Sequence, residues 1–584
     1  MKDAENRADK AKGQNKAVNS RNSAKHQEVE GYRWRYRLLQ LVLVVAGLLV
    51  FGRLLDLQVF NRTFLQSEGD KRAVRYESIP AHRGVIFDRN GKMLAVSAPV
   101  MTLWADPQSL VQAPERWQEL ANALDVDFDG LSRRIKNNAS REFIYLKRQM
   151  IPEEGQKVLD LNIPGVFKRD EHRRYYPLGE VTAHLVGITG IDDKGQEGLE
   201  LGYNHWLTGK EGRQRVLRDR RGHLVKEAEV VTGASPGKEL MLSIDLRLQY
   251  MAYRELKKAV EKYQARSGSL VMLDVETGEV LAMVNQPSYN PNNRASMQPY
   301  RMRNRVMTDI MEPGSTLKPF TVAAAIESGK YDKFTEINTG NGYMRLGRDA
   351  VRDLGGYGRI DVEQVLVRSS NIGVSKMALD IGADSVMSLM RRIGIGQSTG
   401  TGFPGERIGY LPYKDRWSDI EIATLSFGYG LTMTPLQLAQ AYMVLGAGGI
   451  MRPVSLIKRD VAPEGSRVMD QEVAREVLEM LGAVVRKGSG RRAGVPSYEV
   501  GGKTGTVRKI GNSGYSDNRY TGLFAGVAPI DNPKLATVVI IDDPAGKQFY
   551  GGLTAAPVFS KVNAQALRLL GVKPTERKVL TAER

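Results

Sequence analysis

A predominantly apolar segment near the N-terminus constrains this chain more than any other feature. The segment runs from Leu38 to Leu57 and contains only Gln40, Arg53 and Asp56 as polar residues. About 20 such residues form a helix long enough to cross the hydrocarbon core of a bilayer. Arginines at positions 33, 35 and 37 precede it, as is typical of the cytoplasmic flank of a membrane span. We therefore expect an uncleaved transmembrane anchor over residues 38–57.

Two other interpretations of this segment stay open. A signal peptide has a short basic leader and a small-x-small cleavage site, but 37 residues precede the segment and no such site follows it. The buried helix of a soluble domain would tolerate the same polar residues. With an anchor, the tail 1–37, which carries ten Lys or Arg against five Asp or Glu and is expected to be disordered, is cytoplasmic. In a bacterium, the rest of the chain would then be periplasmic, outside the inner membrane.

Composition excludes several classes of function. The 584 residues contain no cysteine, which excludes disulfides, thiolate catalysis and cysteine-ligated metals. All six histidines precede position 236 and show no metal-ligand spacing, so we expect no metal and no cofactor. The net charge of +18 is dispersed and accompanies no nucleic-acid-binding motif. We therefore expect no nucleic-acid partner, whereas proximity to anionic lipid headgroups is compatible with this charge.

The chain is longer than one hydrophobic core usually organises, so we expect at least two domains. Residues 61–235 alternate strand-like and turn-rich segments, including a hairpin turn at Asn90-Gly91, and contain no catalytic set. We expect this part to be a non-catalytic, extended β-rich pedestal. A second domain is expected over residues 236–571, followed by a polar C-terminal tail over residues 572–584.

The second domain has strand patterns at both of its ends. Helical spacing over Leu242–Val260 is followed by a predicted hairpin that joins Ser269–Val275 to Glu279–Val284. Helical patterns fill the middle, and strands return at Tyr520–Ala528 and Leu535–Ile541 before a helix near residues 555–570. A sheet assembled from both ends of a domain, with helices between them, predicts a mixed α+β layer fold.

Three short motifs occur in an informative order in the second domain. They are Ser315-Thr316-Leu317-Lys318, Ser369-Ser370-Asn371 and Lys503-Thr504-Gly505. The first two patterns are weak alone, because Ser-x-x-Lys recurs at positions 235 and 455 and Ser-x-Asn at 20, 288 and 516. Only one arrangement places Ser-x-x-Lys at the start of a helix, then Ser-x-Asn, then the single Lys-Thr-Gly on a predicted strand. This arrangement predicts a serine acyl-transfer site.

Ser315 is expected in the first turn of a helix, where free N–H groups and the helix dipole stabilise an alkoxide or oxyanion. Because the domain has no histidine, the remaining conventional base is a lysine with a lowered pKa, and Lys318 lies one turn further along the same face. Pro319 cannot donate to the Ser315 carbonyl, so the first turn should be irregular. The alternative, an ordinary buried helix with an incidental lysine, would leave a costly unpaired ammonium.

The second motif falls in a short connection between helical patterns at 361–368 and 372–381. Alone, it favours a simple helix cap. Beside Ser315, however, Ser369 offers a hydroxyl that can relay a proton, and Asn371 offers an amide that can hold a peptide carbonyl or the lysine.

The third motif combines a cation, two hydroxyls and close backbone access. Lys503 with the hydroxyls of Thr504 and Thr506 suits a terminal carboxylate. Glycines, among them Gly505, let a ligand backbone approach and pair along the strand.

At these motifs the chain resembles the penicillin-binding proteins, whose signature is Ser-x-x-Lys, Ser-x-Asn and Lys-Thr-Gly in this order. The resemblance covers nearly everything after residue 30 and is to the class B, division-specific (septal, FtsI-type) transpeptidases. Beyond the signature, it rests on the basic tail and single anchor, Arg83-Gly84 with Asp88-Arg89-Asn90-Gly91, Tyr176-Pro177 with Gly179, Gly198-Leu199-Glu200, and Ser426-Phe427-Gly428-Tyr429-Gly430 with Thr434-Pro435-Leu436-Gln437-Leu438.

The resemblance implies D,D-transpeptidation of peptidoglycan stem peptides that end in D-Ala-D-Ala and derive from a lipid-linked precursor. It implies that Ser315 is the nucleophile, that Lys318 accepts and returns its proton, and that Ser369 shuttles this proton. Lys503 would maintain the electrostatics and Asn371 would orient the substrate amide. The implied fold is a pedestal of the dimerisation type followed by a transpeptidase domain with an antiparallel sheet flanked by helices.

The resemblance also implies how substrate and inhibitors bind. Thr504 and Thr506 would bind the terminal carboxylate, and the backbone N–H groups of Ser315 and Thr506 would form the oxyanion hole. β-Lactams would acylate Ser315, and an FtsW-type glycosyltransferase and other division proteins would be partners by analogy. Val507 departs from the family pattern, in which a small alanine is expected after Lys-Thr-Gly-Thr. Aromatic candidates for the cleft, each of which also suits an ordinary core, are Tyr429, Tyr520, Phe549 and Tyr550.

Three rival functions remain open within the same fold. The motifs do not distinguish a transpeptidase from a D,D-carboxypeptidase or β-lactamase, in which water completes the reaction. A non-catalytic scaffold or β-lactam sensor is the second rival, although every motif residue is intact. The third is an enzyme of side-wall elongation instead of the septum.

Overall fold

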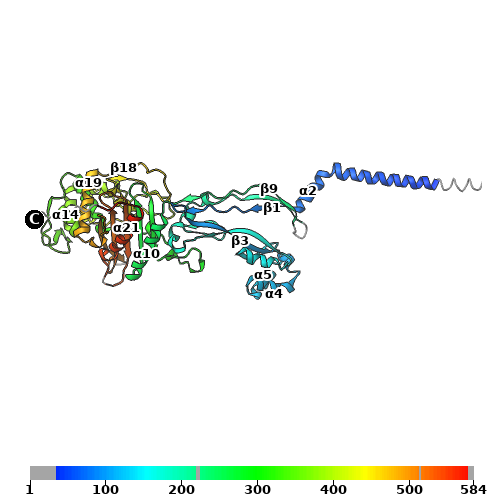
Figure 1. The fold of residues 1–584 in the computed structure, drawn as a ribbon, viewed down its shortest axis with the longest axis horizontal. Coiled ribbons are helices and arrows are strands. Elements are labelled where there is room, and N and C mark those ends of the chain that lie inside the picture. Colours follow the sequence, from blue (N-terminus) through cyan, green and yellow to red (C-terminus); the bar gives the residue numbers. More distant parts are fainter. Residues whose placement is uncertain (1–33, 219–223, 512–513, 547, 576–584) are drawn as a thin grey trace, which may run out of the picture. The chain divides into compact units, whose positions relative to one another are not determined.

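The computed structural model describes residues 34–218, 224–511, 514–546 and 548–575 (Figure 1). It divides into two compact units, and each is described by itself. The first comprises the described residues up to Ile79 together with Glu211–Gly233, and the second comprises Pro80–Lys210 together with the described residues from Ala234 onward. The expected tail 1–37 lies almost entirely outside the described residues, as does most of the C-terminal tail 572–584.

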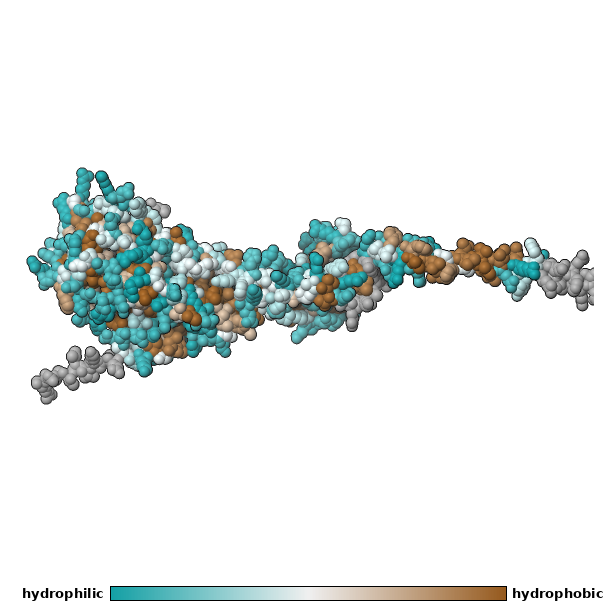
Figure 2. All heavy atoms as spheres, turned by 90° about the horizontal axis from the view of Figure 1, so that it is seen from above, coloured by the Kyte–Doolittle hydropathy of each residue, from teal (hydrophilic) through white to brown (hydrophobic). Residues whose placement is uncertain are grey.

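The first unit contains the apolar N-terminal helix. This helix runs from Trp34 to Phe60, and none of its most apolar stretch is buried. Figure 2 shows brown apolar side chains on the face of this helix that is in view, and the helix's large apolar residues are exposed. The helix is longer than the predicted 38–57 because helical geometry continues through the flanking polar residues, ending in a π-helical turn, η1 (Asp56–Phe60). Its length and composition are sufficient to cross a membrane.

After this helix, the first unit continues into α2 (Arg62–Ala73) and a three-stranded sheet. The strand order is β1 (Val74–Ile79), β8 (Gly212–Arg218) and β9 (Leu224–Thr232), with antiparallel pairing throughout. The sheet joins segments that are more than 130 residues apart in the sequence, as Ser78 and Glu211 do through a 2.7 Å hydrogen bond.

The second unit begins with a sheet whose central strand is the long β3 (Met93–Ala105). The predicted turn at Asn90-Gly91 does join an antiparallel pair, β2 (Ile86–Phe87) and β3. The remaining strands are β4 (Ile144–Met150) and β5 (Val166–Tyr175), which pair with β3, and β10 (Leu240–Met241), which pairs with β2.

Helices in this region were not predicted. They are α4 (Trp117–Leu124), α5 (Phe128–Asn137) and α6 (Pro152–Leu159). In α4, Trp117, Leu120, Ala121 and Leu124 are buried, which is the spacing of one helical face. These helices pack with β3 and β4 into a small separate core.

Three buried charges hold the segment before β2 in place. The Arg83 Nε and Arg174 Nε atoms lie 2.5 and 2.6 Å from the two carboxylate oxygens of Glu200, and all three side chains are at most 1% exposed. Arg83 also donates to Asn204 at 2.9 Å, and Arg174 donates to the carbonyl of Gly84 at 2.7 Å. Each buried charge is therefore paired and hydrogen-bonded, as burial requires.

The rest of the second unit is built around a five-stranded antiparallel sheet with the order β12-β11-β21-β20-β19. The strands are β11 (Ser267–Asp274), β12 (Val280–Gln286), β19 (Gly501–Gly511), β20 (Gly514–Ala528) and β21 (Leu535–Asp542). The predicted hairpin and the two predicted late strands thus belong to one sheet. Among the described residues, β19 is an edge strand that pairs only with β20.

Helices cover both faces of this sheet, so the predicted antiparallel sheet flanked by helices is confirmed. One face packs against α10 (Leu246–Lys262) and α21 (Ala556–Leu569), which Figure 1 shows side by side. The other face packs against the fully buried α18 (Pro435–Gly446) and the helices around it. The helices around it are α13 (Lys318–Glu327), α14 (Val362–Arg368), α15 (Asn371–Ile381), α16 (Ala383–Arg392), α17 (Asp419–Ser426) and α19 (Gln471–Lys487).

Candidate active site

Ser315 lies in a tight turn that leads into a buried helix. The turn, η5 (Gly314–Leu317), is a 3-10 helix, and α13 begins at Lys318. The irregular first turn expected from Pro319 is therefore present. Ser315 is half-buried, and within the described residues neither its hydroxyl nor its backbone N–H makes a hydrogen bond. Both groups are thus available to a ligand at the N-terminal end of the helix.

Lys318 is fully buried and points at the second motif. Its Nζ lies 2.6 Å from the carbonyl oxygen of Ser369, 3.2 Å from the Ser369 hydroxyl and 2.7 Å from Oδ1 of Asn371. Burial lowers the pKa of Lys318 well below its ordinary value, the positive charge of Lys503 adds to this effect, and Asp353 opposes it.

Lys503 reaches the same hydroxyl from the sheet. Its Nζ donates to Oγ of Ser369 at 2.9 Å and to the carbonyl of Thr504 at 3.2 Å, and burial lowers its pKa to about 7. Two buried amines therefore share one hydroxyl oxygen. Because each positive charge disfavours the other, the pair is disposed to hold an unprotonated amine near neutral pH.

Ser369 has a left-handed backbone, with φ of 58° at the end of α14. This conformation is costly for a residue with a side chain. It turns the chain sharply between α14 and α15, so that both the carbonyl and the hydroxyl of Ser369 face Lys318.

Asp353 orders the start of α15, and no sequence pattern had singled it out. Its carboxylate accepts hydrogen bonds from the Ser370 hydroxyl and the Asn371 backbone N–H, each at 2.5 Å, and from the Ile372 N–H at 3.1 Å. Ser370 in turn caps α15 by accepting from the Gly373 N–H at 2.9 Å. Asp353 thus fixes the residue whose amide oxygen binds Lys318.

Strand β19 passes directly against η5, the turn that carries Ser315. A Cβ atom added to Gly505 would lie 3.0 Å from Cγ2 of Thr316 and 3.2 Å from the carbonyl oxygen of Pro313. The strand can approach this closely because Gly505 has no side chain. The hydroxyl of Thr504 is hydrogen-bonded to Ser489 at 2.7 Å, and that of Thr506 accepts from the Gly551 N–H at 3.1 Å.

A second glycine segment supports the turn from behind. The Gly314 N–H donates to the carbonyl of Gly428 at 3.0 Å, and a Cβ atom on Gly428 would lie only 2.2 Å from the Gly314 carbonyl oxygen. The hydroxyl of Tyr442 donates to the Thr316 carbonyl at 2.8 Å. The conformation of the turn is therefore held by the protein interior.

The aromatic candidates fall into two groups. Tyr520, Phe549 and Tyr550 stack in succession, with ring centroids 4.0 and 4.5 Å apart, and Tyr550 precedes the Gly551 that binds Thr506. Tyr429 packs edge-on against Phe427 and follows the Gly428 that supports the turn. Both groups therefore adjoin the site through neighbouring backbone.

The described residues include no cluster of three or more His, Asp or Glu side chains arranged to hold a metal ion. What the structure does bring together is a half-buried serine, two buried lysines with lowered pKa values, a shared hydroxyl, an amide and a glycine-containing edge strand. This set can deliver a nucleophilic oxygen to a peptide carbonyl without a metal or an imidazole.

Family models match both parts of the chain. The penicillin binding protein transpeptidase domain matches residues 268–564, and the penicillin-binding protein dimerisation domain matches residues 78–242. The chain belongs to the penicillin-binding protein transpeptidase family, and its sequence places it in the FtsI-type class B group. The family resemblance seen in the motifs is therefore confirmed.

The relatives are similar over almost their whole length. The chain is 43% identical over 547 residues to the peptidoglycan D,D-transpeptidase FtsI of Escherichia coli, with 93% of this chain and 92% of the relative covered. It is also 43% identical over 542 residues to the probable peptidoglycan D,D-transpeptidase PbpC of Pseudomonas aeruginosa, covering 93% and 96%. Among solved structures, penicillin-binding protein 3 of Mycobacterium tuberculosis in complex with aztreonam has a TM-score of 0.67 at 26% identity, covering 86% of this chain and 98% of that one.

Proposed function

We propose that this protein is a serine peptidoglycan D,D-transpeptidase that cross-links stem peptides ending in D-Ala-D-Ala. The observation that carries the proposal is the convergence of Lys318 and Lys503 on the Ser369 hydroxyl. Lys318 follows Ser315 by one helical turn. This arrangement provides an amine with a lowered pKa one turn along the chain from a serine hydroxyl that makes no hydrogen bond among the described residues. The family and the names of the relatives support the same reaction.

In the acylation step, Oγ of Ser315 attacks the carbonyl of the penultimate D-alanine while its proton passes to Nζ of Lys318. The tetrahedral intermediate then collapses, the C–N bond breaks, and the terminal D-alanine leaves with a proton returned from Lys318 through the hydroxyl of Ser369. An ester between Ser315 and the donor peptide remains. Lys318 ends this step as the free amine with which it began.

In the second step, an amine of a neighbouring stem peptide attacks the ester. Lys318 removes its proton and returns one to the Ser315 oxygen, so that a new peptide bond forms and the enzyme is regenerated. β-Lactams present an activated amide at the same position and acylate Ser315 in the same way, although the ester they form is slow to leave.

The surrounding groups position the peptide and stabilise charge. The backbone N–H groups of Ser315 and Thr506 hold the oxyanion, and loss of one such donor typically costs about 100-fold or more in rate. The hydroxyls of Thr504 and Thr506 and the charge of Lys503 bind the terminal carboxylate. Asn371, besides holding Lys318, orients the substrate amide.

The aromatic residues complete the cleft. Tyr429 lines one wall, and the stack of Tyr520, Phe549 and Tyr550 lines the other, beyond Gly505 and the carboxylate-binding threonines. Their positions next to Gly428 and Gly551 support this assignment.

The protein is anchored in the inner membrane by its apolar N-terminal helix. The length and composition of this helix and the FtsI relatives support this assignment. We assign the N-terminus to the cytoplasm and the catalytic domain to the periplasm, on the basis of the arginines before the anchor. The site of action is the division septum, where an FtsW-type glycosyltransferase would supply glycan strands made from the lipid-linked precursor, by analogy with the family.

Mass spectrometry of the intact protein after exposure to penicillin tests the nucleophile. We expect one adduct on Ser315, none in Ser315→Ala, and a normal adduct in Ser328→Ala, a control serine just beyond the same helix. A purified Ser315→Ala protein that still cross-links donor and acceptor peptides would refute the proposal. Rapid release of hydrolysed penicillin by the wild type would instead identify a β-lactamase.

A further inference from the structure

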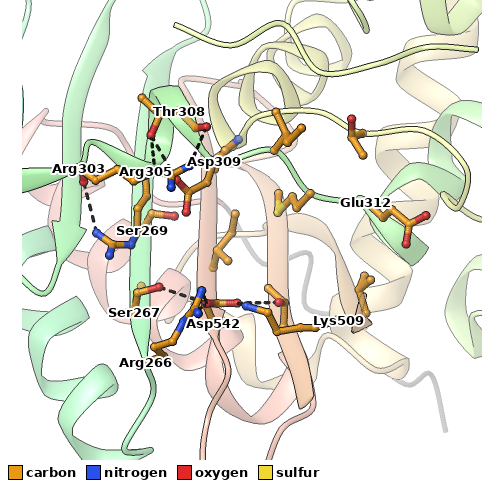
Figure 3. Close-up of a pocket in the computed structure, with 18 of the residues that line it drawn as sticks. Arg266, Ser267, Ser269, Arg303, Arg305, Thr308, Asp309, Glu312, Lys509 and Asp542 are labelled. Carbon is orange, nitrogen blue, oxygen red and sulfur yellow. Dashed lines mark hydrogen bonds and ion pairs between the residues drawn. The ribbon is translucent and has the colours of Figure 1, made fainter. Parts of the chain in front are cut away.

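Two cavities of the second unit differ in how their cations are balanced. In the cavity of about 390 Å³ beside η5 (Figure 3), carboxylates lie among the cations: Asp309 pairs with Arg303 at 2.6 Å, and Asp542 pairs with Arg266 at 3.2 Å. A second cavity, of about 290 Å³, has no carboxylate among the described residues that line it. We call it the arginine cavity, after the three arginines in its lining, Arg148, Arg173 and Arg294.

The arginine cavity lies where the two matched domains meet. Arg148 on β4 and Arg173 on β5 belong to the dimerisation domain, whereas Arg294 begins the 3-10 turn η4 (Arg294–Ser296) of the transpeptidase domain. The segment before η4 is tied to the dimerisation domain by Asn292, which accepts from the Tyr176 N–H at 3.0 Å and donates to the Tyr176 carbonyl at 2.8 Å. An anion in this cavity would therefore contact both domains.

Two of the three guanidinium groups have no carboxylate partner among the described residues. Arg173 donates to the backbone carbonyl of Asn292 at 3.4 Å, and Arg294 donates to that of Thr189 at 2.7 Å. Both side chains are exposed. A guanidinium presents a planar fork of donors that matches the two oxygens of a carboxylate. The cavity is thus suited to bind carboxylates.

Arg148 gives a second, independent indication of a ligand. Its terminal nitrogens bind Asp192 at 2.9 Å and Glu171 at 3.4 Å. Its Nε, however, is buried and has no hydrogen-bond partner in the part of the chain that the structure describes. A buried donor without a partner is costly. An oxygen atom of a ligand in the cavity would satisfy it.

A group of four aromatic residues begins at Arg148. The guanidinium of Arg148 lies 4.6 Å from the ring centroid of Tyr145, whose ring meets that of Phe143 edge-on at 4.8 Å. Phe143 is 5.0 Å from Trp104, and Trp104 stacks on Phe167 of β5 at 4.7 Å. We call Phe143, Tyr145, Trp104 and Phe167 the aromatic row. The row and the arginine cavity are continuous through Arg148.

The aromatic row lies on the outer face of its sheet. Leu103 and Ala105 are fully buried in the small core with α4, α5 and α6, so Trp104 between them faces the other side. On this outer face, Phe143 is 41% and Tyr145 36% exposed. Adjoining exposed aromatic rings are typical of a surface that binds another protein, and arginine is enriched at such surfaces too.

The length of the face indicates the form of the ligand. Phe167 and Arg173 are both on β5 and six residues apart, which corresponds to about 20 Å at 3.3 Å per residue. An extended segment of about six residues covers this length. The phosphate of a lipid headgroup would fill the arginine cavity but would leave the aromatic row uncovered. Aromatic rings beside unpaired arginines therefore favour a peptide with both apolar and acidic side chains.

We propose that this face docks an acidic, extended segment of a partner protein. Apolar side chains of the segment pack on the aromatic row, and its carboxylates bind Arg173, Arg294 and the Nε of Arg148. Because these arginines come from both domains, the bound segment joins the dimerisation domain to the transpeptidase domain.

Selection from a random peptide library displayed on phage tests this proposal without a known partner. The full-length protein is immobilised in detergent, and an excess of the double variant Arg173→Gln/Arg294→Gln is kept in solution, so that only peptides that distinguish the two proteins are retained. We expect the retained peptides to carry Asp or Glu next to aromatic or aliphatic residues. Synthetic copies, measured by fluorescence anisotropy, should bind the double variant about tenfold or more weakly than the wild type.

Single variants locate the binding surface. Phe143→Ser should also weaken binding, because it removes an exposed ring of the aromatic row. Arg133→Gln is the matched control: Arg133 is an exposed arginine on α5 whose guanidinium makes no hydrogen bond or ion pair with the described residues, and binding should not change. Penicillin should acylate every variant as it does the wild type, which shows that each is folded.

Three results would overturn the proposal. The first is that no peptide distinguishes the wild type from the double variant. The second is that the retained peptides lack carboxylates or lose as much affinity in Arg133→Gln. The third is that vesicles containing phosphatidylglycerol bind the wild type but not the double variant while no acidic peptide is retained, which would assign the cavity to a lipid phosphate.

Discussion

The substitution Asp353→Asn tests how the second motif is held and how Lys318 is tuned. The carboxylate accepts three hydrogen bonds at the start of α15, two of them at 2.5 Å. Hydrogen bonds to a charged group contribute about 1.5–3 kcal/mol each, but asparagine keeps one acceptor oxygen and the site is half-buried. We therefore expect a loss of about 1–2 kcal/mol in the free energy of unfolding, or a few degrees in Tm.

The same substitution should change the pH dependence of acylation. Asp353 raises the pKa of Lys318, so removing its charge lowers that pKa further. Because Lys318 acts as the free amine, the rate of acylation rises with pH through the pKa of Lys318. The acid limb of the rate profile should consequently move to lower pH. Stopped-flow acylation with a fluorescent penicillin, measured across the acid range, reports this shift.

Asp361→Asn is the matched control for Asp353→Asn. Asp361 caps the preceding helix, α14, by accepting from the Gln364 N–H at 2.7 Å, and it is not among the charges that shift Lys318. It should lower Tm by a similar amount and leave the acid limb in place. If Asp353→Asn lowered Tm but left the limb unmoved, or moved it to higher pH, Lys318 would not be the base.

Three further substitutions test other parts of the site and its support. The wild-type rate should fall on an alkaline limb near pH 7 as Lys503 loses its proton, and Lys503→Arg, which stays charged, should move this limb to higher pH in the same acylation assay. Gly428→Ala should slow acylation at least tenfold, because the added Cβ would lie 2.2 Å from the Gly314 carbonyl oxygen. Gly430→Ala is the control: Gly430 also has a positive φ, but an added Cβ would meet no atom within 4 Å, so acylation should slow less. Glu200→Gln removes the carboxylate that both buried guanidinium groups contact, so urea unfolding should show a loss of about 3–5 kcal/mol in the free energy of unfolding. A loss below about 1 kcal/mol would mean that water reaches the two guanidinium groups.

Most of the core of the site could be predicted from the sequence, because its residues come from motifs with their own local signals. Lys318 follows Ser315 by one helical turn, and a glycine-containing strand pattern surrounds Lys503. The absence of histidine from the domain left a lysine as the base. The structure places Lys318, Ser369, Asn371 and Lys503 in one hydrogen-bond network.

Asp353 could not be predicted, because a single carboxylate in a glycine-rich loop has no spacing that identifies a partner. Its contact with α15 depends on how the loop folds back. By contrast, α4 was missed although its apolar residues repeat at helical spacing, since the surrounding strand and turn patterns dominated the interpretation. The proposed domain boundaries at 61–235 and 236–571 stay a prediction.

The edge of β19 that pairs with no other strand among the described residues carries a further consequence. Main-chain hydrogen bonds along an edge strand depend on the extended shape of the bound backbone and little on its side chains. A rigid molecule that mimics the dipeptide backbone can therefore form the same hydrogen bonds as the dipeptide. A side-chain substitution on β19 cannot weaken these main-chain hydrogen bonds for the inhibitor and keep them for the substrate. Selective escape from such an inhibitor must therefore arise in the groups that only one of the two ligands touches.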